Sequence, residues 1–168
     1  MSDLIYNQRD IPAEQWRYGF RTSADTGCGW IATYNALALM GYRVNPEALI
    51  HYYEWMIPFV HGNLGTTALA PARFFRQHGF GVETTACADG FDRLAKESNV
   101  CILFYHWRRG CRLGAHFVAV QYRDGRFTGY NTFRTSSGPD DYGASLEAFI
   151  RAHHFHAPVL IGIRDKKA

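Results

Sequence analysis

The chain has 168 residues, of which 47% are apolar, 15% aromatic and 20% charged, a composition typical of one globular domain and not of a disordered segment. The formal charge of +3 comes from scattered lysines and arginines with one dense cluster, at Arg108, Arg109 and Arg112, so no basic stripe indicates nucleic acid. No apolar run approaches the ~20 residues of a membrane span, and the N-terminus lacks the regions of a signal peptide. We therefore expect a single domain over residues 1–168, located in the cytoplasm, with neither nucleic acid nor a membrane as a partner.

The first half of the chain is expected to be helical after an irregular segment over residues 1–24. Apolar residues between Thr26 and Gly41 recur at three- and four-residue steps around nearly the whole circumference, which predicts a buried helix. Asp25 and Thr26 are types that favour a helix N-cap, and Gly41 favours a C-terminal end. Two more helices are expected: one capped by Asn45 that runs to about Met56 before Pro58, and one that passes from Ala72 to Gln77 before Gly79.

The second half changes to the two-residue period of β-strands. Residues 100–105 are β-branched and aromatic and are expected to form a central strand. Residues 115–122 are expected to pair with residues 127–131 across an Asp124-Gly125 hairpin turn. The other predictions are a strand at 82–85, a short helix at 89–98, loops at 106–114 and 135–143, a last helix at 145–153 and a closing strand at 158–163. This order predicts an α+β fold, with an N-terminal helical half packed on an antiparallel β-sheet half.

Cys28 differs from the other three cysteines because it lies between Gly27 and Gly29 at the expected helix start. The four cysteines have no C-x-x-C spacing and are expected to be free thiols. Unpaired N–H groups and the positive end of the helix dipole favour an anion, so we expect the pKa of this thiol to lie below its usual ~8.5. The glycines are expected to allow a sharp turn and the approach of a substrate. The alternative is a small, inert, buried cysteine.

A thiol nucleophile needs a base, and the base needs a third group that holds its ring in the correct tautomer. Among eight histidines, His116 opens an apolar strand and follows the small residues Gly114 and Ala115. Asn131 is expected near the level of His116 on the partner strand, where it could accept a hydrogen bond from one ring nitrogen. The alternatives are a core histidine bonded to backbone and a turn-forming asparagine. No metal and no cofactor are predicted, because the remaining histidine cluster lacks a partnering Cys or Asp: His153, His154 and His156.

Three short blocks resemble the Cys, His and Asn/Asp motifs of papain-like cysteine peptidases in their order and approximate spacing. They are Gly-Cys-Gly-Trp, Ala-His-Phe-Val-Ala-Val and Tyr-Asn-Thr-Phe. The short chain and the His block are most similar to the peptidase domains that cleave double-glycine leader peptides from bacteriocins, and to their stand-alone bacterial relatives. In that group a glutamine upstream of the cysteine donates to the oxyanion. The resemblance implies this role for Gln8, with Gln15 as the competitor. Many leader peptidases have a proline after the Cys-Gly pair, where this chain has Trp30.

The residues and the resemblance together lead us to expect a cysteine hydrolase, a peptidase or amidase, whose substrate is a peptide or another amide. Cys28, His116 and Asn131 would form its triad and act through a thioester acyl-enzyme, and the Cys28 N–H and Gln8 would hold the oxyanion. Two alternatives stay open. One is an acyltransferase or transglutaminase-type enzyme on the same fold, and the other is a non-catalytic peptide-binding module. The sequence also leaves the oligomeric state open.

Overall fold

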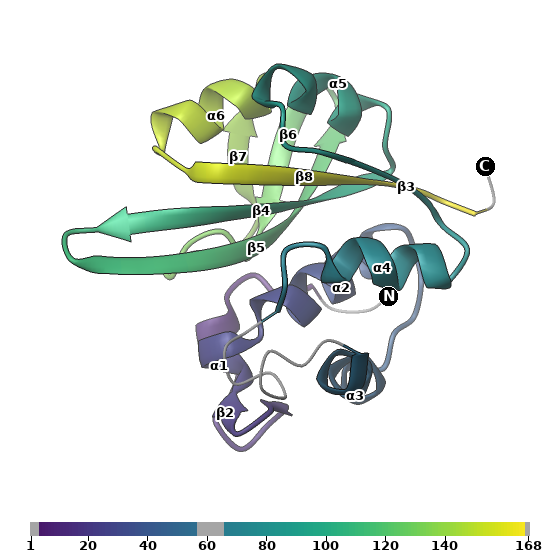
Figure 1. The fold of residues 1–168 in the computed structure, drawn as a ribbon, viewed down its shortest axis with the longest axis vertical. Helices are drawn as coiled ribbons and strands as arrows, with labels where there is room; N and C mark the ends of the chain where they lie inside the picture. The colour runs from purple at the N-terminus through teal and green to yellow at the C-terminus, as the bar shows by residue number, and fades with distance from the viewer. Residues whose placement is uncertain (1–3, 57–65, 167–168) are drawn as a thin grey trace.

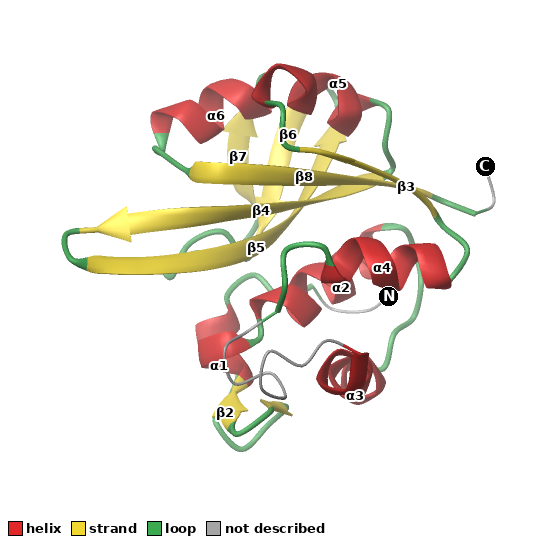
Figure 2. Ribbon diagram, in the orientation of Figure 1, coloured by secondary structure: helices red, strands yellow, loops and turns green. Residues whose placement is uncertain are grey.

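The computed structural model describes residues 4–56 and 66–166 and arranges them in three layers (Figure 1 and Figure 2). Helices of the N-terminal half lie against one face of a six-stranded antiparallel sheet, and two later helices cover the opposite face. The α+β class predicted from the order of the elements is confirmed.

The first half of the chain contains short elements around three longer helices. It forms the 3-10 helix η1 (Gln8–Asp10), the paired strands β1 (Arg17–Tyr18) and β2 (Arg21–Thr22), and the helices α1 (Ser23–Thr26), α2 (Cys28–Leu39), α3 (Pro46–Met56) and α4 (Ala70–Gln77).

The second half contributes the large sheet and its outer helices. Its elements are β3 (Gly81–Thr85), η2 (Ala88–Gly90), α5 (Phe91–Lys96), β4 (Val100–Arg109), β5 (Arg112–Arg123), β6 (Arg126–Tyr130), β7 (Asp140–Gly143), α6 (Leu146–Ala152) and β8 (His156–Arg164). The strand order is β3-β8-β4-β5-β6-β7, so residues 100–105 do lie in a central strand as predicted.

Side chains that alternate along the central strands divide the core between the two faces of the sheet. Ile102 on β4 and Phe117 on β5 belong to the hydrophobic cluster that includes α2. Leu103 and Val118 point the other way, into the cluster with α5 and α6. The sheet is therefore buried on both faces, and α2 is fixed against the face that carries Phe117.

The helix predicted between Thr26 and Gly41 is confirmed as α2, in which nine of twelve residues are buried. Gly41 follows its end with φ +85°, a left-handed conformation that suits glycine and ends a helix. The predicted N-cap is wrong. Asp25 and Thr26 belong to α1, and the cap residue is Gly27, which makes no side-chain cap hydrogen bond. The reason is that α1 ends directly before α2 and leaves no extended residue between them.

The other helices follow their local signals. Asn45 Oδ1 accepts the Glu47 N–H at 2.9 Å ahead of α3, α4 carries Pro71 in its first turn, and the predicted last helix is α6, capped by Ser145. The helix predicted at 89–98 is present as η2 followed by α5. Pro58, expected to end α3, lies outside the described residues. None of the described helices is long and apolar enough to cross a membrane.

Two predicted loops contain strands instead. Across residues 106–114, β4 and β5 continue as a hairpin with Arg109 opposite Arg112. Within residues 135–143 lies β7, paired with β6. The hairpin tip is mostly polar and exposed, so it lacks the alternation that marks a half-buried strand, and backbone pairing forms it. In β7 only Tyr142 is buried, which is too short an apolar signal to mark a strand. The Asp124-Gly125 turn is confirmed, with φ of +52° and +80°.

Candidate active site

Cys28 is the first residue of α2 and is half-buried against the sheet. Backbone N–H groups of Phe117, Gly29 and Cys28 itself lie close enough to the sulfur to favour the thiolate. Burial outweighs them and raises the pKa of the Cys28 thiol to about 11. The prediction of a lowered pKa is therefore wrong for the free protein, because the helix start that should favour an anion is itself packed away from water.

Gly27 and Gly29 serve packing within the protein. A Cβ on Gly27 would lie 2.5 Å from Ser23 O and 2.6 Å from Trp30 Nε1. A Cβ on Gly29 would lie 2.3 Å from Oγ1 of Thr66. The expected role of these glycines in admitting a substrate needs correction, because Ser23, Trp30 and Thr66 occupy the space that the missing side chains leave.

Trp30 is an internal anchor of the helix start. Its side chain is fully buried, its indole Nε1 donates to Ser23 Oγ at 3.2 Å, and its ring meets that of Trp16 edge to face at 5.8 Å. Ser23 Oγ in turn donates to the Trp16 carbonyl. This network holds α1 against the first turn of α2 and so fixes where Cys28 lies.

His116 lies on β5, beside the Phe117 backbone that approaches the thiol. Its Nε2 is 2.6 Å from the backbone carbonyl oxygen of Asn131. A carbonyl oxygen only accepts, so Nε2 carries the proton and Nδ1 of the neutral ring is left as an acceptor. Burial lowers the pKa of His116, which the Asn131 contact partly offsets. The ring is thus held neutral in the tautomer that a general base needs.

Asn131 follows β6 directly and has φ +67°, a conformation that Asn tolerates better than most residues. Its carbonyl turns toward His116, whereas its side chain turns toward the N-terminal segment. Asn131 Oδ1 accepts the Gln8 N–H at 2.8 Å, and Asn131 Nδ2 donates to Gln8 Oε1 at 3.2 Å. Asn131 is the partner of His116 as predicted, but through its backbone and not through its side chain.

Gln8 reaches the same region from η1. Besides its bonds to Asn131, Gln8 Nε2 donates to the carbonyl of Ala24 at 2.8 Å. An amide nitrogen carries two hydrogens, so one donor remains for another acceptor. Gln15 is exposed, and only its backbone N–H has a hydrogen bond among those found in the described residues, to Pro12 O. The structure brings Gln8, and not Gln15, to Asn131.

The four predicted residues meet around the junction of α1, α2 and β5. Hydrogen bonds link His116 to Asn131 and Asn131 to Gln8, while Cys28 adjoins the backbone next to His116. Within the described part of the chain, no hydrogen bond joins the Cys28 sulfur to the His116 ring. No group of three or more His, Cys, Asp or Glu side chains among the described residues is placed to hold a metal ion.

Two residues that the sequence did not single out lie beside Cys28. Tyr18 is fully buried, and its hydroxyl is 3.1 Å from Oγ1 of Thr66, the side chain that covers Gly29. Burial raises the pKa of Tyr18, and the nearby Cys28 and Glu54 act in the same direction. No local pattern could reveal this pair, because Tyr18 and Thr66 meet across a separation of 48 residues.

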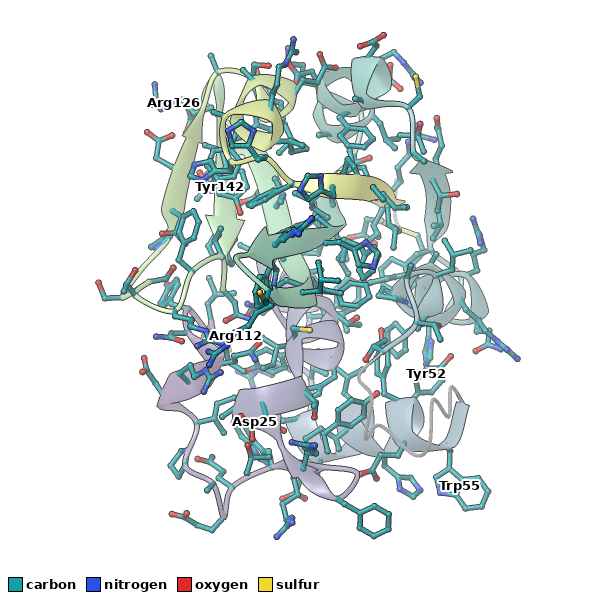
Figure 3. The ribbon with its side chains drawn as sticks, turned by 60° about the vertical axis from the view of Figure 1, so that its left-hand side comes forward. Asp25, Tyr52, Trp55, Arg112, Arg126 and Tyr142 are labelled. Atoms are coloured by element: carbon teal, nitrogen blue, oxygen red, sulfur yellow. The ribbon has the colours of Figure 1, made fainter. Side chains whose placement is uncertain are left out.

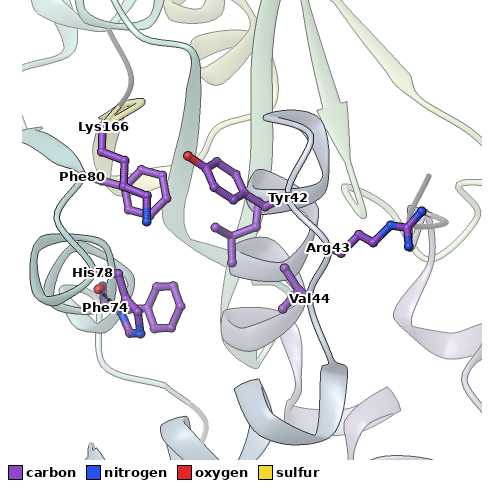
Figure 4. A pocket seen from close by; sticks show the side chains of 8 residues that line it. Tyr42, Arg43, Val44, Phe74, His78, Phe80 and Lys166 are labelled. Atoms are coloured by element: carbon purple, nitrogen blue, oxygen red, sulfur yellow. Dashed lines mark hydrogen bonds between the residues drawn. The ribbon is translucent and has the colours of Figure 1, made fainter.

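A shallow pocket of about 170 Å³ lies at the opposite, C-terminal end of α2 (Figure 4). Its lining includes Leu37, Tyr42 and Phe80, and Lys166 lies 5.1 Å from the ring centre of Phe80. It is separated from Cys28 by the length of the helix, so it takes no part in the candidate site.

No protein-family model matches this sequence, and no curated protein is significantly similar to it.

Proposed function

We propose that the protein is a cysteine hydrolase, a peptidase or amidase, with Cys28 as the nucleophile and His116 as the general base. Asn131 orients the base through its carbonyl, and Gln8 donates to the oxyanion. A buried helix that begins with the cysteine and packs on an antiparallel sheet that carries the histidine resembles the papain-like arrangement, so we include that fold in the proposal.

The observation that carries this proposal is the bond from His116 Nε2 to the Asn131 carbonyl at 2.6 Å. It leaves Nδ1 unprotonated in the neutral ring, on a residue whose neighbour Phe117 adjoins the thiol. The same backbone bond would satisfy a core histidine, so the support for a general base comes from the thiol beside Phe117. The second support is the position of Cys28 at a helix start, where its own N–H is available to a developing oxyanion.

The reaction follows from these positions. His116 Nδ1 takes the thiol proton as the Cys28 sulfur bonds to the carbonyl carbon, and the oxyanion accepts from the Cys28 N–H and from the second hydrogen of Gln8 Nε2. The imidazolium then protonates the leaving amine, and the C–N bond breaks to give a thioester. Water attacks the thioester with its proton passing to Nδ1, and the thiol leaves with that proton.

The resting pair in this scheme is neutral, a thiol beside an imidazole. Burial raises the pKa of Cys28 to about 11 and lowers that of His116, so both shifts oppose a preformed thiolate-imidazolium pair. The proton therefore moves when the substrate is in place, and a small thiol reagent meets an unreactive sulfur in the free protein.

Alkylation of the nucleophile by a peptide-directed reagent tests the proposal. The protein is incubated with a peptidyl acyloxymethyl ketone pool, and modified sites are located by mass spectrometry. We expect modification of Cys28 in preference to the exposed Cys87 and Cys111, abolished by Cys28→Ala and lowered at least ~100-fold by His116→Ala. His153→Ala, at the end of α6, and Cys87→Ala serve as matched controls that keep the reaction. Modification of all three thiols at equal rates would remove the basis for an enzyme.

A non-catalytic peptide-binding module is the second candidate. The raised pKa of Cys28 and the lack of a bond from its sulfur to His116 in the described structure favour it. Peptide binding by a protein whose Cys28 resists the peptidyl reagent would select this candidate. The acyltransferase alternative needs a separate assay with a pool of peptidyl esters, which acylate the thiol as the alcohol leaves. Preferential transfer of the acyl group to an added amine, in place of water, would identify it.

A further inference from the structure

The β4–β5 hairpin extends past its neighbours as an arm. On one side, β8 pairs with β4 only as far as His106. On the other, β6 pairs with β5 only from Ala119 onward. Residues 112–118 of β5 therefore lie along an outer edge without a neighbouring strand in the described structure, and Figure 1 shows the hairpin tip projecting beyond the helices.

The register decides which backbone groups face this edge. Arg109 lies opposite Arg112 across a two-residue turn, so this pair exchanges hydrogen bonds, and every second pair after it does the same. The residues between, Leu113, Ala115 and Phe117, turn their N–H and C=O groups away from β4. The β5–β6 pairing agrees, because Ala119 continues this set and bonds to β6. No backbone hydrogen bond found in the described residues uses Leu113 or Ala115 on that side.

This free edge leads directly to the candidate nucleophile. Phe117, the last outward-facing residue before β5 begins to pair with β6, has its backbone beside the Cys28 sulfur. Leu113 is 77% exposed, and Ala115 between them is exposed as well. An extended chain laid along Leu113 and Ala115 would therefore arrive at Cys28 without turning.

The arm is also strongly basic. The chain contains no Asp or Glu between Glu97 and Asp124, whereas Arg108, Arg109 and Arg112 are all on the arm. Arg108 and Arg112 are exposed, and Arg112 is labelled in Figure 3. An occupant of this edge would meet positive charge and no negative charge from the arm.

We propose that the free edge of β5 at Leu113 and Ala115 binds an extended, acidic segment of the peptide substrate as an additional strand. This inference rests on the proposed function and names its substrate class. Backbone hydrogen bonds to Leu113 and Ala115 hold the segment in register, and Arg108 and Arg112 select acidic side chains.

Two other occupants fit the edge less well. A second copy of this chain paired edge to edge would place the arginines of both arms close together, and such like charges oppose pairing. A nucleic acid would satisfy the arginines but has no strand of alternating N–H and C=O groups to offer Leu113 and Ala115. Only a peptide uses both the edge and the charge.

Binding to the full-length Cys28→Ala protein tests the inference without any need for turnover. The probes are fluorescein-labelled decapeptides with glutamate at alternate positions and randomised residues between them, compared with lysine counterparts by fluorescence anisotropy. We expect the glutamate pool to bind at least tenfold more tightly, and added salt to reduce the difference. Arg108→Ala and Arg112→Ala should each weaken binding of the glutamate pool about two- to fivefold.

Leu113→Pro isolates the backbone contribution. It removes the outward N–H but leaves the ladder to β4 intact, and is expected to weaken binding of the glutamate pool about 5- to 20-fold, whereas Leu113→Val keeps the N–H and should change it less than twofold. Probes N-methylated at alternate amides repeat this test on the unaltered arm, in case Leu113→Pro misfolds.

Three results would each overturn the inference. The first is equal binding of the glutamate and lysine pools. The second is equal effects of Leu113→Pro and Leu113→Val together with unchanged affinity for N-methylated probes, and the third is displacement of the probe by dimer formation at higher protein concentration. Tighter binding of a single-stranded oligonucleotide that Leu113→Pro leaves unchanged would do so too. Because the Cys28→Ala protein cannot turn over, loss of the proposed hydrolysis and loss of this binding are separate results.

Discussion

At the scale of single residues, the backbone and the side chain of Asn131 bind different partners. Its carbonyl holds His116, and its side chain makes two hydrogen bonds with Gln8. Every residue has a carbonyl, so the sequence could indicate Asn131 by its type but could not indicate which of its groups acts. The position still favours Asn, because φ is +67° and the side chain has a donor and an acceptor.

Substitutions at Asn131 should follow from this division. Asn131→Gly keeps the carbonyl and suits the positive φ, so we expect a smaller loss of kcat than the ~100- to 1000-fold expected for Gln8→Ala as an oxyanion donor. Asn131→Gly should lower the free energy of unfolding by about 2 kcal/mol for two lost bonds, and Asn131→Ala by roughly 1 kcal/mol more for the left-handed backbone. Urea denaturation and steady-state kinetics measure both. A loss of kcat as large as that of His116→Ala would mean that the side chain orients the ring.

The pKa shifts of Cys28 and His116 predict how the proposed hydrolysis should depend on pH. As the pH falls through the lowered pKa of His116, below 6.5, the ring gains a proton and can no longer accept one, so kcat/KM falls on the acid side. The pKa of Cys28 is about 11, so the thiol stays protonated at neutral pH. Alkylation of Cys28 by iodoacetamide should therefore rise about tenfold per pH unit from neutral pH upward.

A variant without the exposed thiols, Cys87→Ala with Cys111→Ala, makes that alkylation specific because Cys101 is buried. If the rate of Cys28 alkylation no longer depended on pH at about pH 5 and above, a preformed thiolate-imidazolium pair would be identified instead.

How much of the site the sequence could predict depends on the kind of contact. Cys28 and His116 could be proposed from residue type, flanking glycines and strand pattern. The raised pKa of Cys28 could not, because it depends on packing between α2 and the sheet that no local pattern contains. The choice between Gln8 and Gln15 likewise needed a contact across 123 residues of chain.

At the scale of elements, substitutions of the glycines at the two ends of α2 should destabilise the protein for different reasons, steric overlap at the start and backbone strain after the end. Gly27→Ala would push a methyl group against the Ser23 backbone and the Trp30 ring, so we expect a loss of about 1–3 kcal/mol in the free energy of unfolding. The new methyl group of Gly29→Ala would overlap the Thr66 side chain, so this variant should lose a similar amount of free energy of unfolding. Gly41→Ala is the matched control. It has φ +85° but nothing within 4 Å, so only backbone strain of roughly 1–2 kcal/mol applies.

A double variant tests whether the overlap with Thr66 is what destabilises Gly29→Ala. Thr66→Gly removes the atoms that a Cβ on Gly29 would meet, so Gly29→Ala should be much less destabilising in the Thr66→Gly background, as measured by urea denaturation. If the losses of free energy of unfolding in Gly29→Ala and Thr66→Gly were additive, contact with Thr66 would not be the cause of the destabilisation by Gly29→Ala.

The elements that could be predicted are those with local signals. Asn45 before α3, Gly41 after α2 and the Asp124-Gly125 turn each have a residue type whose conformation is restricted. The β4–β5 arm and β7 were wrongly expected to be loops. The arm is held by strand pairing without an apolar face, and β7 buries only Tyr142, so neither shows an alternating pattern. The N-cap of α2 was wrong because α1 directly precedes it.

At the scale of the whole molecule, the N-terminal segment joins the helical half to the sheet half. Asn35, buried in α2, bonds to the N–H and the carbonyl of Ile5 at 2.9 and 2.8 Å. A few residues later, Asn7 Nδ2 donates to the Arg134 carbonyl at 3.0 Å, and Gln8 bonds to Asn131. The segment is thus fixed at one end to a helix and at the other to the loop after β6, and it carries Gln8 to the site.

Asn35 and Asn131 should therefore be energetically coupled, although they make no contact with each other in the described structure. Asn35→Ala leaves the Ile5 backbone groups without partners and should lower the free energy of unfolding by about 2–4 kcal/mol. Once the N-terminal segment is released from α2, its bonds to Asn131 contribute less to the stability of the protein. Asn131→Gly should therefore lower the free energy of unfolding by less in the Asn35→Ala background.

A double-mutant cycle by urea denaturation measures this coupling, which we expect to be roughly 1 kcal/mol. Asn45→Ala, which removes a cap bond on α3 that does not involve the segment, is the control and should be additive with Asn131→Gly. Additive losses for the Asn35 and Asn131 pair would show that the two ends are held independently. In that case the segment would not transmit stability between the helical half and the sheet, and Gln8 would be positioned by Asn131 and Ala24 alone.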